Sequence, residues 1–207
     1  MKIFIYSNEE QEKEIRQKSY PDTMTLFFSR NSPTLEETEN HDAFFLLHDD
    51  NEIMDLTGFK NKPVVIHSVT KNLANDSLPT NVARINAWPG FLQRTVWEIA
   101  HNENEVIPAI FKKLQWDIIK VKDEPGLISG RVISMIINEA FFALKEGVST
   151  KKEIDLAMKL GTNYPYGPFE WAEKIGIDKV YDLLNTLSQS DIRCTPSFNK
   201  DGKINIS

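Results

Sequence analysis

The sequence predicts an α/β domain with a mainly parallel sheet, followed by an all-α domain. Up to residue 121, short apolar runs alternate with polar, helix-like stretches, which is typical of β-α-β units. From residue 122 onwards, apolar side chains recur at helical spacing. Seven of the 9 glycines also lie in this second part, between Gly126 and Gly202. We therefore expect two domains, residues 1–121 and 122–207.

Seven short runs of β-branched and aromatic residues are the strand candidates of the first domain. In chain order they are Lys2–Tyr6, Met24–Phe28, Ala43–Leu47, Pro63–His67, Ala83–Asn86, Thr95–Ala100 and Asp117–Val121. The helices expected between them are Glu9–Lys18, Asn51–Leu56 and Glu103–Lys113. Asn8 is placed to cap the first of these helices. Since strands that alternate with helices pair in parallel, we expect a mostly parallel sheet of about six strands.

The second domain is expected to be helical, and its turn residues predict where the first two helices begin and end. Pro125 can open the first helix, and Gly147 is placed to end it. Thr150 and Glu153 form a capping-box pattern at the start of the second helix. Gly161 is placed to stop that helix.

Two further helices follow a turn at Pro165–Pro168. They are expected over Phe169–Ile175 and Asp178–Leu187. The tail from Ser188 is polar, and we expect it to be loosely ordered.

The composition indicates a globular protein without a nucleic-acid or membrane partner. The net charge of −6 and the pI near 5.3 oppose binding to a phosphate backbone. No apolar run approaches the roughly 20 residues that cross a bilayer, and the first residues lack the long apolar segment of a secretory signal. Cys194 is the only cysteine, so an internal disulfide is excluded. We expect a cytoplasmic protein.

Three motifs of the second domain occur in the order and spacing of a known family. They are KDEPGLISGRV at Lys122–Val132, INEAFFALKEGVSTKKEIDLAMKLG at Ile137–Gly161 and YPYGPFEWAEKIGID at Tyr164–Asp178. This part of the chain resembles the C-terminal helical domain of the 3-hydroxyacyl-CoA dehydrogenase family. The resemblance implies a Rossmann-like first domain, and C-terminal helices that form a homodimer and close over acyl-CoA. It also implies NAD as the cofactor of an active member.

The first domain departs from the family pattern at the cofactor site. The family has G-x-G-x-x-G after its first strand, where glycines let the backbone approach a pyrophosphate. Here Ser7 and Asn8 follow the first strand, and three of the next four residues are Glu. Side chains and negative charge at these positions oppose phosphate binding. We therefore assign no cofactor, although Arg30, after the second strand, is of the type that suits a 2′-phosphate.

The catalytic positions of the family are also changed. The stretch Asn86–Ile99 aligns with the family segment that holds a catalytic His and its Glu partner. Glu98 is retained, but Asn86 stands at the position of the His, and Gly130 at that of a substrate-site Asn. An amide cannot accept a proton at neutral pH, so Asn86 cannot act as the general base. In a looser alignment, Lys71 stands at the position of an active-site Ser.

Three functions remain open from the sequence. The first is a dimeric pseudoenzyme that keeps the fold and an acyl-CoA site but not NAD-dependent activity. The second is an active NAD-linked dehydrogenase of fatty-acid metabolism. The third is a different enzyme on the same scaffold, which would use Glu98 and Arg131 with His67 or Lys71. The coordinated loss of the cofactor and base positions favours the first function.

Overall fold

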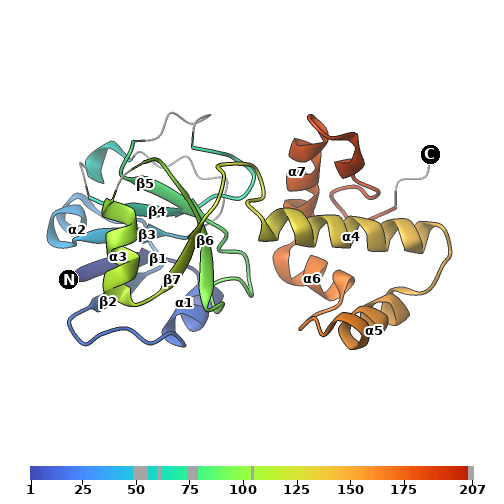
Figure 1. The fold of residues 1–207 in the computed structure, drawn as a ribbon, viewed down its shortest axis with the longest axis horizontal. Helices are drawn as coiled ribbons and strands as arrows, with labels where there is room; N and C mark the ends of the chain where they lie inside the picture. Colours follow the sequence, from blue (N-terminus) through green and yellow to red (C-terminus); the bar gives the residue numbers. More distant parts are fainter. Residues whose placement is uncertain (49–55, 60–61, 74–78, 104, 205–207) are drawn as a thin grey trace. The chain divides into compact units, whose positions relative to one another are not determined.

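The chain forms two compact units, residues 1–127 and 128–207, in the computed structural model (Figure 1). The structure describes residues 1–48, 56–59, 62–73, 79–103 and 105–204. Unit 1 contains the predicted α/β domain, and unit 2 contains the predicted helical domain. The sequence placed the boundary after residue 121. Unit 1 extends to residue 127 because the segment after the last strand bonds back to its loops.

Unit 1 is built on a seven-stranded sheet in the order β2-β1-β3-β4-β5-β6-β7. The strands are β1 (Lys2–Tyr6), β2 (Thr25–Ser29), β3 (Ala43–Leu46), β4 (Val64–His67), β5 (Val82–Ile85), β6 (Val96–His101) and β7 (Asp117–Lys120). All seven strand candidates are confirmed, which is one strand more than the expected six or so. Neighbouring strands pair in parallel, except that β5 and β6 are antiparallel. The sheet is therefore mostly parallel, as predicted.

Helical segments connect these strands. Those that the structure describes are α1 (Glu9–Arg16), α2 (Leu35–Asn40), the 3-10 turn η1 (Thr57–Phe59) and α3 (Val106–Leu114). Asn8 caps α1 as expected. Helix α2 was not predicted, although Thr34 and Glu37 form a capping box at its start. The predicted helix Asn51–Leu56 lies outside the described residues, apart from its last residue.

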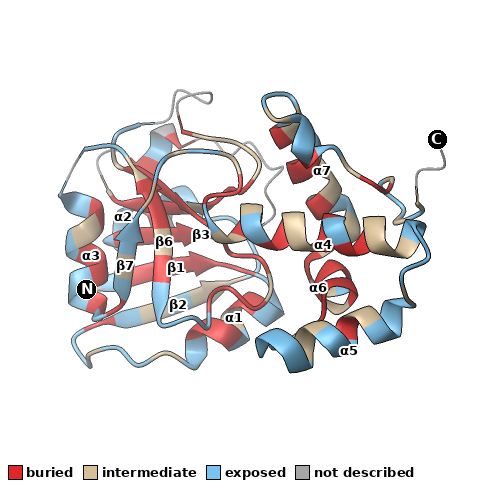
Figure 2. Ribbon diagram, turned by 45° about the vertical axis from the view of Figure 1, so that its right-hand side comes forward, coloured by how far each residue is buried: buried red, intermediate tan, exposed pale blue. Residues whose placement is uncertain are grey.

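The sheet is covered on both faces, which explains why its strands are apolar along their length. On one face, Ile15 of α1 and Phe111 of α3 pack on strand residues such as Phe45. On the other face, Phe44 packs against Phe59 of η1, with ring centroids 4.8 Å apart. Figure 2 shows β1 buried along most of its length. Burial of each large apolar side chain stabilises this unit by roughly 1.5–3 kcal/mol.

Unit 2 contains the four predicted helices. They are α4 (Ser129–Lys145), α5 (Lys151–Thr162), α6 (Pro168–Ile175) and α7 (Ile177–Ser188), followed by the 3-10 turn η2 (Ile192–Cys194). The prediction that Pro125 opens the first helix is wrong. Gly126 and Leu127 have positive φ angles of 87° and 51°, outside the right-handed helical region, so the helix begins only after them. No helix among the described residues is long and apolar enough to span a membrane.

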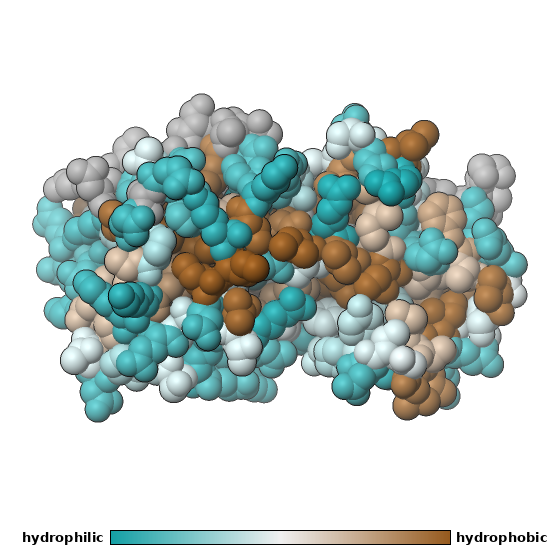
Figure 3. Space-filling model, viewed as in Figure 1, coloured by the Kyte–Doolittle hydropathy of each residue, from teal (hydrophilic) through white to brown (hydrophobic). Residues whose placement is uncertain are grey.

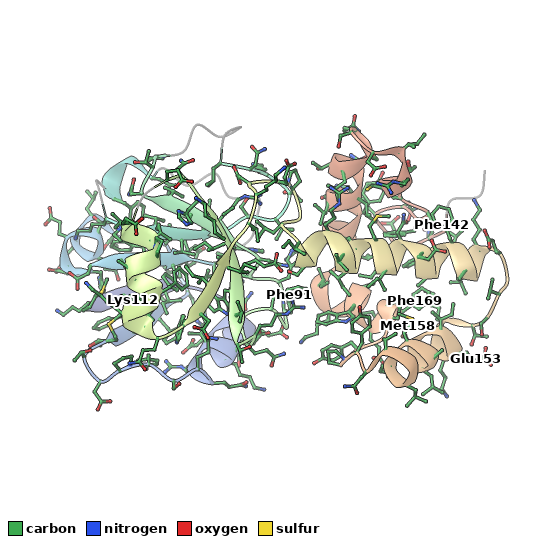
Figure 4. The ribbon with its side chains drawn as sticks, viewed as in Figure 1. Phe91, Lys112, Phe142, Glu153, Met158 and Phe169 are labelled. Atoms are coloured by element: carbon green, nitrogen blue, oxygen red, sulfur yellow. The ribbon has the colours of Figure 1, made fainter. Side chains whose placement is uncertain are left out.

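The ends of α4 and α5 confirm two of the predicted helix-end signals and contradict a third. Gly147 follows α4 with a φ of 70°, as expected of a glycine that ends a helix. Glu153, labelled in Figure 4, completes the predicted capping box with Thr150 at the start of α5. The prediction that Gly161 stops α5 is wrong. The helix runs one residue further, and Asn163 ends it in the left-handed conformation with a φ of 56°.

The segment after α7 packs on α4, so the prediction of a loosely ordered tail is wrong for the residues described up to 204. The Asn138 carboxamide of α4 donates to the Thr195 carbonyl at 2.9 Å and accepts from the Ser197 N–H at 2.8 Å. Phe198 is fully buried, and its ring lies 4.3 Å from that of Phe141 between centroids. The tail therefore belongs to the core of unit 2.

The contact between α5 and α6 depends on a glycine. Gly167 precedes α6 and has no side chain to cap it, so the Asp155 carboxylate of α5 accepts from the Phe169 N–H at 2.8 Å instead. A Cβ atom on Gly167 would lie only 2.3–2.4 Å from side-chain atoms of Asp155. Burial raises the pKa of Asp155 above its ordinary value and outweighs the opposing effect of the bond from Phe169.

We expect Gly167→Ala to destabilise unit 2 by about 1–3 kcal/mol, because the added methyl group overlaps Asp155 and displaces the cap. Gly161→Ala is the matched control, since it lies inside α5 and nothing lies within 4 Å of its added Cβ. The control is expected to stabilise the unit by about 0.5–1 kcal/mol. Thermal unfolding followed by circular dichroism measures both. Shifts of the same sign in the two variants would contradict the prediction.

Candidate functional site

The ends of the parallel strands define where a ligand would bind in unit 1. The chain passes from β1 to β2 on one side and then to β3 on the other, so the strand order reverses between β1 and β3. Open α/β sheets bind ligands outside the carboxyl ends of their strands at such a reversal. In this chain Ser7, Leu47 and Asn86 directly follow β1, β3 and β5, and His67 is the last residue of β4. We call these four residues the carboxyl edge.

In the turn between β1 and α1, the backbone N–H groups of Asn8 and Gln11 bond to side chains of the same turn. Ser7 is fully buried. The Asn8 side chain accepts from the Gln11 N–H at 2.9 Å, and the Gln11 side chain accepts from the Asn8 N–H at 3.0 Å. These backbone N–H groups are of the kind that would point at a phosphate on a helix N-terminus. In this turn the capping box uses them instead.

The Gln11 side chain also crosses the carboxyl edge. Its amide nitrogen donates to the carbonyls of Leu47 at 2.6 Å and Ala87 at 3.1 Å, which follow β3 and β5. Gln11 is only 4% exposed, so the carboxamide is a buried link between strand ends. The first turn of α1 also carries Glu9, Glu10 and Glu12. A pyrophosphate needs free N–H donors and close backbone approach, so these residues do not fit the NAD site that the resemblance implies.

Arg30 bonds to the same turn. Its guanidinium donates to the Ser7 carbonyl at 3.1 Å and to the Glu12 carboxylate. Glu12 also accepts from Arg16 at 2.7 Å. Partial burial acts to raise the pKa of Glu12, but the hydrogen bonds from Arg30 and Arg16 outweigh it, so this pKa is lowered. The positive charge of Arg30 is therefore paired with the Glu12 carboxylate of the same protein.

Glu14 organises the loop that follows β5. Its carboxylate is buried and accepts from the N–H groups of Gly90, Leu92 and Gln93 at 2.5–3.2 Å. Gly90 has a φ of 89°, which favours glycine and turns the chain so that these N–H groups converge. Helix α1 thus binds this loop through Glu14, as it binds the strand ends through Gln11.

Asn86 and Glu98 are brought together by the sheet. β5 and β6 pair with Ile85 opposite Ile99, so the antiparallel register carries Asn86 to the position opposite Glu98. Asn86 is 7% exposed, and its carboxamide oxygen accepts from the Trp88 N–H at 3.0 Å. The structure therefore places the two predicted residues opposite each other in register, an amide at Asn86 and a carboxylate at Glu98.

The predicted alternatives to that base have separate environments. His67 is buried at the end of β4, and its Nδ1 accepts from the Ala87 N–H at 3.0 Å, so its neutral form carries the proton on Nε2. Lys71 lies in the loop after β4, where its carbonyl accepts from the Ser68 hydroxyl at 3.3 Å.

Gly130 and Arg131 lie in the first turn of α4 in unit 2. Gly130 is buried, and Arg131 donates to the Asp191 carboxylate at 3.4 Å. Hydrogen bonds from Arg193 lower the pKa of Asp191 to about 2. Arg131 therefore has the Asp191 carboxylate as a partner within unit 2.

Two residues that shape the carboxyl edge were missed from the sequence. Gln11 lies three residues before Glu14 and four residues before Ile15, so these three side chains share the buried face of α1. The signal was present, because Ile15 is the only apolar residue of α1, and a helix that covers a sheet must then bury polar side chains. No cluster of His, Cys, Asp and Glu suited to a metal ion occurs among the residues described.

Comparison with known proteins matches the second unit at the level of sequence. The family model for the C-terminal domain of 3-hydroxyacyl-CoA dehydrogenase matches residues 126–199. A 3-hydroxyadipyl-CoA dehydrogenase of Escherichia coli K12 is 44% identical over 70 residues, which are 34% of this chain and 15% of that protein. A probable 3-hydroxybutyryl-CoA dehydrogenase of Bacillus subtilis is 38% identical over 39% of this chain and 28% of its own length. The matched segments thus span less than a third of these relatives.

Comparison with solved structures extends the likeness to the fold of nearly the whole chain. A crystal structure of (S)-3-hydroxybutyryl-CoA dehydrogenase from Ralstonia eutropha has a TM-score of 0.71 and 17% identity, and the match covers 94% of this chain and 90% of that one. A 3-hydroxybutyryl-CoA dehydrogenase structure from Escherichia coli K12 has a TM-score of 0.54 and 30% identity over 64% of this chain and 29% of that one. Unit 2 is thus similar in sequence to the C-terminal domain of 3-hydroxyacyl-CoA dehydrogenases, and nearly the whole chain shares the fold of a solved 3-hydroxybutyryl-CoA dehydrogenase.

Proposed function

We propose that this protein is a non-catalytic member of the 3-hydroxyacyl-CoA dehydrogenase family. The protein binds acyl-CoA as a homodimer and does not oxidise 3-hydroxyacyl-CoA with NAD. The observation that carries the proposal is the Gln11 side chain, which bonds to Leu47 and Ala87 across the carboxyl edge. Removing that side chain to admit a dinucleotide would leave two buried carbonyls without their donor, at a cost of about 1–3 kcal/mol each.

The position of Asn86 supports the same proposal independently. A dehydrogenase of this kind needs a base to take the proton of the substrate hydroxyl as hydride leaves the carbon. Asn86 stands opposite Glu98 in register and cannot accept that proton at neutral pH. Loss of a positioned base lowers a rate by about 10²–10⁴. The proposal therefore has two separate supports: Gln11 opposes binding of the cofactor, and Asn86 cannot act as the base.

Support for an acyl-CoA ligand comes from the relatives. The proteins that share the helical domain are named for 3-hydroxyadipyl-CoA and 3-hydroxybutyryl-CoA, which are both CoA thioesters. The motifs that carry this similarity are retained in unit 2, whereas the changes that argue against oxidation lie mainly in unit 1. A ligand of this class is therefore the one to test first.

Support for a homodimer comes from apolar side chains that unit 2 exposes. Ile128 and Val132, at the start of α4, are 53% and 50% exposed, and Leu156 and Leu160 of α5 are 51% and 78% exposed. Each pair is spaced by four residues, so each forms a short apolar stripe on one helix face. Figure 3 shows brown, apolar surface along α4 and at α5. A second copy of unit 2 would cover such stripes.

Titration with NADH tests the proposal most directly. We expect no saturable change in NADH fluorescence at micromolar protein, and no NAD-dependent oxidation of 3-hydroxybutyryl-CoA. Acetoacetyl-CoA is expected to raise the melting temperature, whereas NAD is not. Sedimentation equilibrium is expected to give about twice the chain mass of 23.8 kDa.

Asn86→His is the matched variant, because it restores the missing base without changing the turn after β1. We expect it to remain inactive, since the cofactor site is still closed by Gln11. Micromolar NADH binding, or oxidation by either protein, would contradict the proposal. A melting temperature that no acyl-CoA shifts would remove the ligand part of it. The cytoplasmic location remains a prediction from the sequence.

A further inference from the structure

Arg84 is a fully buried cation in β5 that the proposed function does not use. Its guanidinium donates to the Asp123 carboxylate, to the Ser68 carbonyl at 3.0 Å and to the Glu124 carbonyl. Ser68 follows β4, and Asp123 and Glu124 follow β7. One side chain thus bonds to two segments that are far apart in the sequence.

The two segments are also bonded to each other around this arginine. The second oxygen of the Asp123 carboxylate accepts from the Leu73 N–H at 2.7 Å, across 50 residues of sequence. The Gly126 N–H donates to the Val69 carbonyl at 2.7 Å. We name Ser68–Leu73 the β4 loop and Lys122–Gly126 the β7 segment. Their cross-links surround the Arg84 guanidinium.

The chemistry of arginine explains why this arrangement depends on one residue. A buried cation is strongly destabilising unless its donors are all satisfied, so the backbone around it must keep a fixed geometry. The planar guanidinium directs its N–H groups in fixed directions, here to one carboxylate and two carbonyls. A lysine ammonium carries all its donors on one nitrogen, without that fork, so it cannot present them from the separate positions of the three guanidinium nitrogens.

We propose that Arg84 is a positioning residue, which holds the β4 loop and the β7 segment together as one rigid element of unit 1. The β4 loop carries Lys71 and starts at the end of β4, directly after His67. Arg84 itself lies two residues before Asn86 on β5. It therefore connects the strand that ends at the carboxyl edge to the segment through which the chain leaves unit 1.

Amide hydrogen exchange of the full chain, measured by NMR at pH 7 without ligand, tests this proposal. In Arg84→Lys, the amides of Leu73 and Gly126 are expected to exchange at least about tenfold faster together, because the bonds that protect them lose their common support. Amides of β1 and β3 are expected to keep their rates. Glu103→Ala is the control, since it removes an exposed ion pair with Lys120 near β7 and should change none of these rates.

Unchanged exchange at Leu73 and Gly126 would overturn the proposal, because the two segments would then hold each other without Arg84. Equal acceleration of β1 and β3 would also overturn it, since Arg84 would then serve only the general stability of the unit. If Arg84→Lys does not fold, Asp123→Ala replaces it. In that variant, faster exchange at Gly126 with unchanged β1 supports the proposal, and an unchanged Gly126 refutes it. No ligand is present, so the result is independent of acyl-CoA binding.

Discussion

Phe198→Ala is expected to lower the free energy of unfolding of unit 2 by about 3–5 kcal/mol. The side chain is fully buried and packs on Phe141, and its ring centroid also lies 6.4 Å from that of Tyr181 in α7. Its removal leaves a cavity between α4 and α7 that neighbouring side chains can fill only in part. Since small units are stable by only about 5–15 kcal/mol, a loss of this size would leave unit 2 largely unfolded on mild heating.

Urea unfolding of the full chain, followed by circular dichroism, measures this effect as a lower midpoint of the transition of unit 2. Ile192→Ala is the control, because Ile192 belongs to the same tail but is 84% exposed. Its expected change is within about 0.5 kcal/mol. Asn138→Ala should fall between the two, since it removes the bonds that hold Thr195 and Ser197. A midpoint for Phe198→Ala equal to that of the control would show that the tail is not part of the core.

Glu14→Ala is expected to destabilise unit 1 by about 2–4 kcal/mol. The carboxylate accepts from the N–H groups of Gly90, Leu92 and Gln93, which have no other acceptor among the residues that the structure describes. Each buried N–H that loses its partner costs about 1–3 kcal/mol, and partial access of water reduces the sum. The loop after Asn86 is expected to lose its order first.

Chemical unfolding monitored by tryptophan fluorescence is suited to this variant, because Trp88 and Trp97 are buried on either side of the loop in the sequence. Lys13→Ala changes an exposed neighbour on the same helix and serves as the control, with an expected change within about 0.5 kcal/mol. Glu14→Gln keeps one carbonyl acceptor and should be intermediate. Equal stabilities of Glu14→Ala and Lys13→Ala would mean that the loop holds its conformation without this carboxylate.

Local patterns in the sequence predicted most of the secondary structure. All seven strand candidates became strands, because a parallel sheet covered on both faces requires continuous apolar runs such as Ala43–Leu46. The predicted capping box of Thr150 and Glu153 is also confirmed, since it depends on residues only three positions apart. Helix α2 was missed because it is short and contains only one large apolar residue, Leu35, which is exposed.

Errors arose where backbone conformation or distant contacts decide the structure. The first helix of unit 2 starts later than Pro125 because Gly126 and Leu127 adopt positive φ angles, which residue types alone do not specify for a leucine. The tail after Ser188 reads as polar, yet one aromatic residue, Phe198, inserts into the core and orders it.

The sequence by itself determined the order of the seven strands and of the four helices of unit 2, and the resemblance of unit 2 to a known family, because these depend on residue identity and short spacing. Only the tertiary structure decided that Gln11 joins two strand ends, that Glu14 binds a loop more than seventy residues away, and that Arg84 links the β4 loop to the β7 segment. The physical reason is that a polar side chain can be buried only where partners from other segments satisfy it. Those partners are set by the packing of α1 on the sheet and by the place of β5 within it.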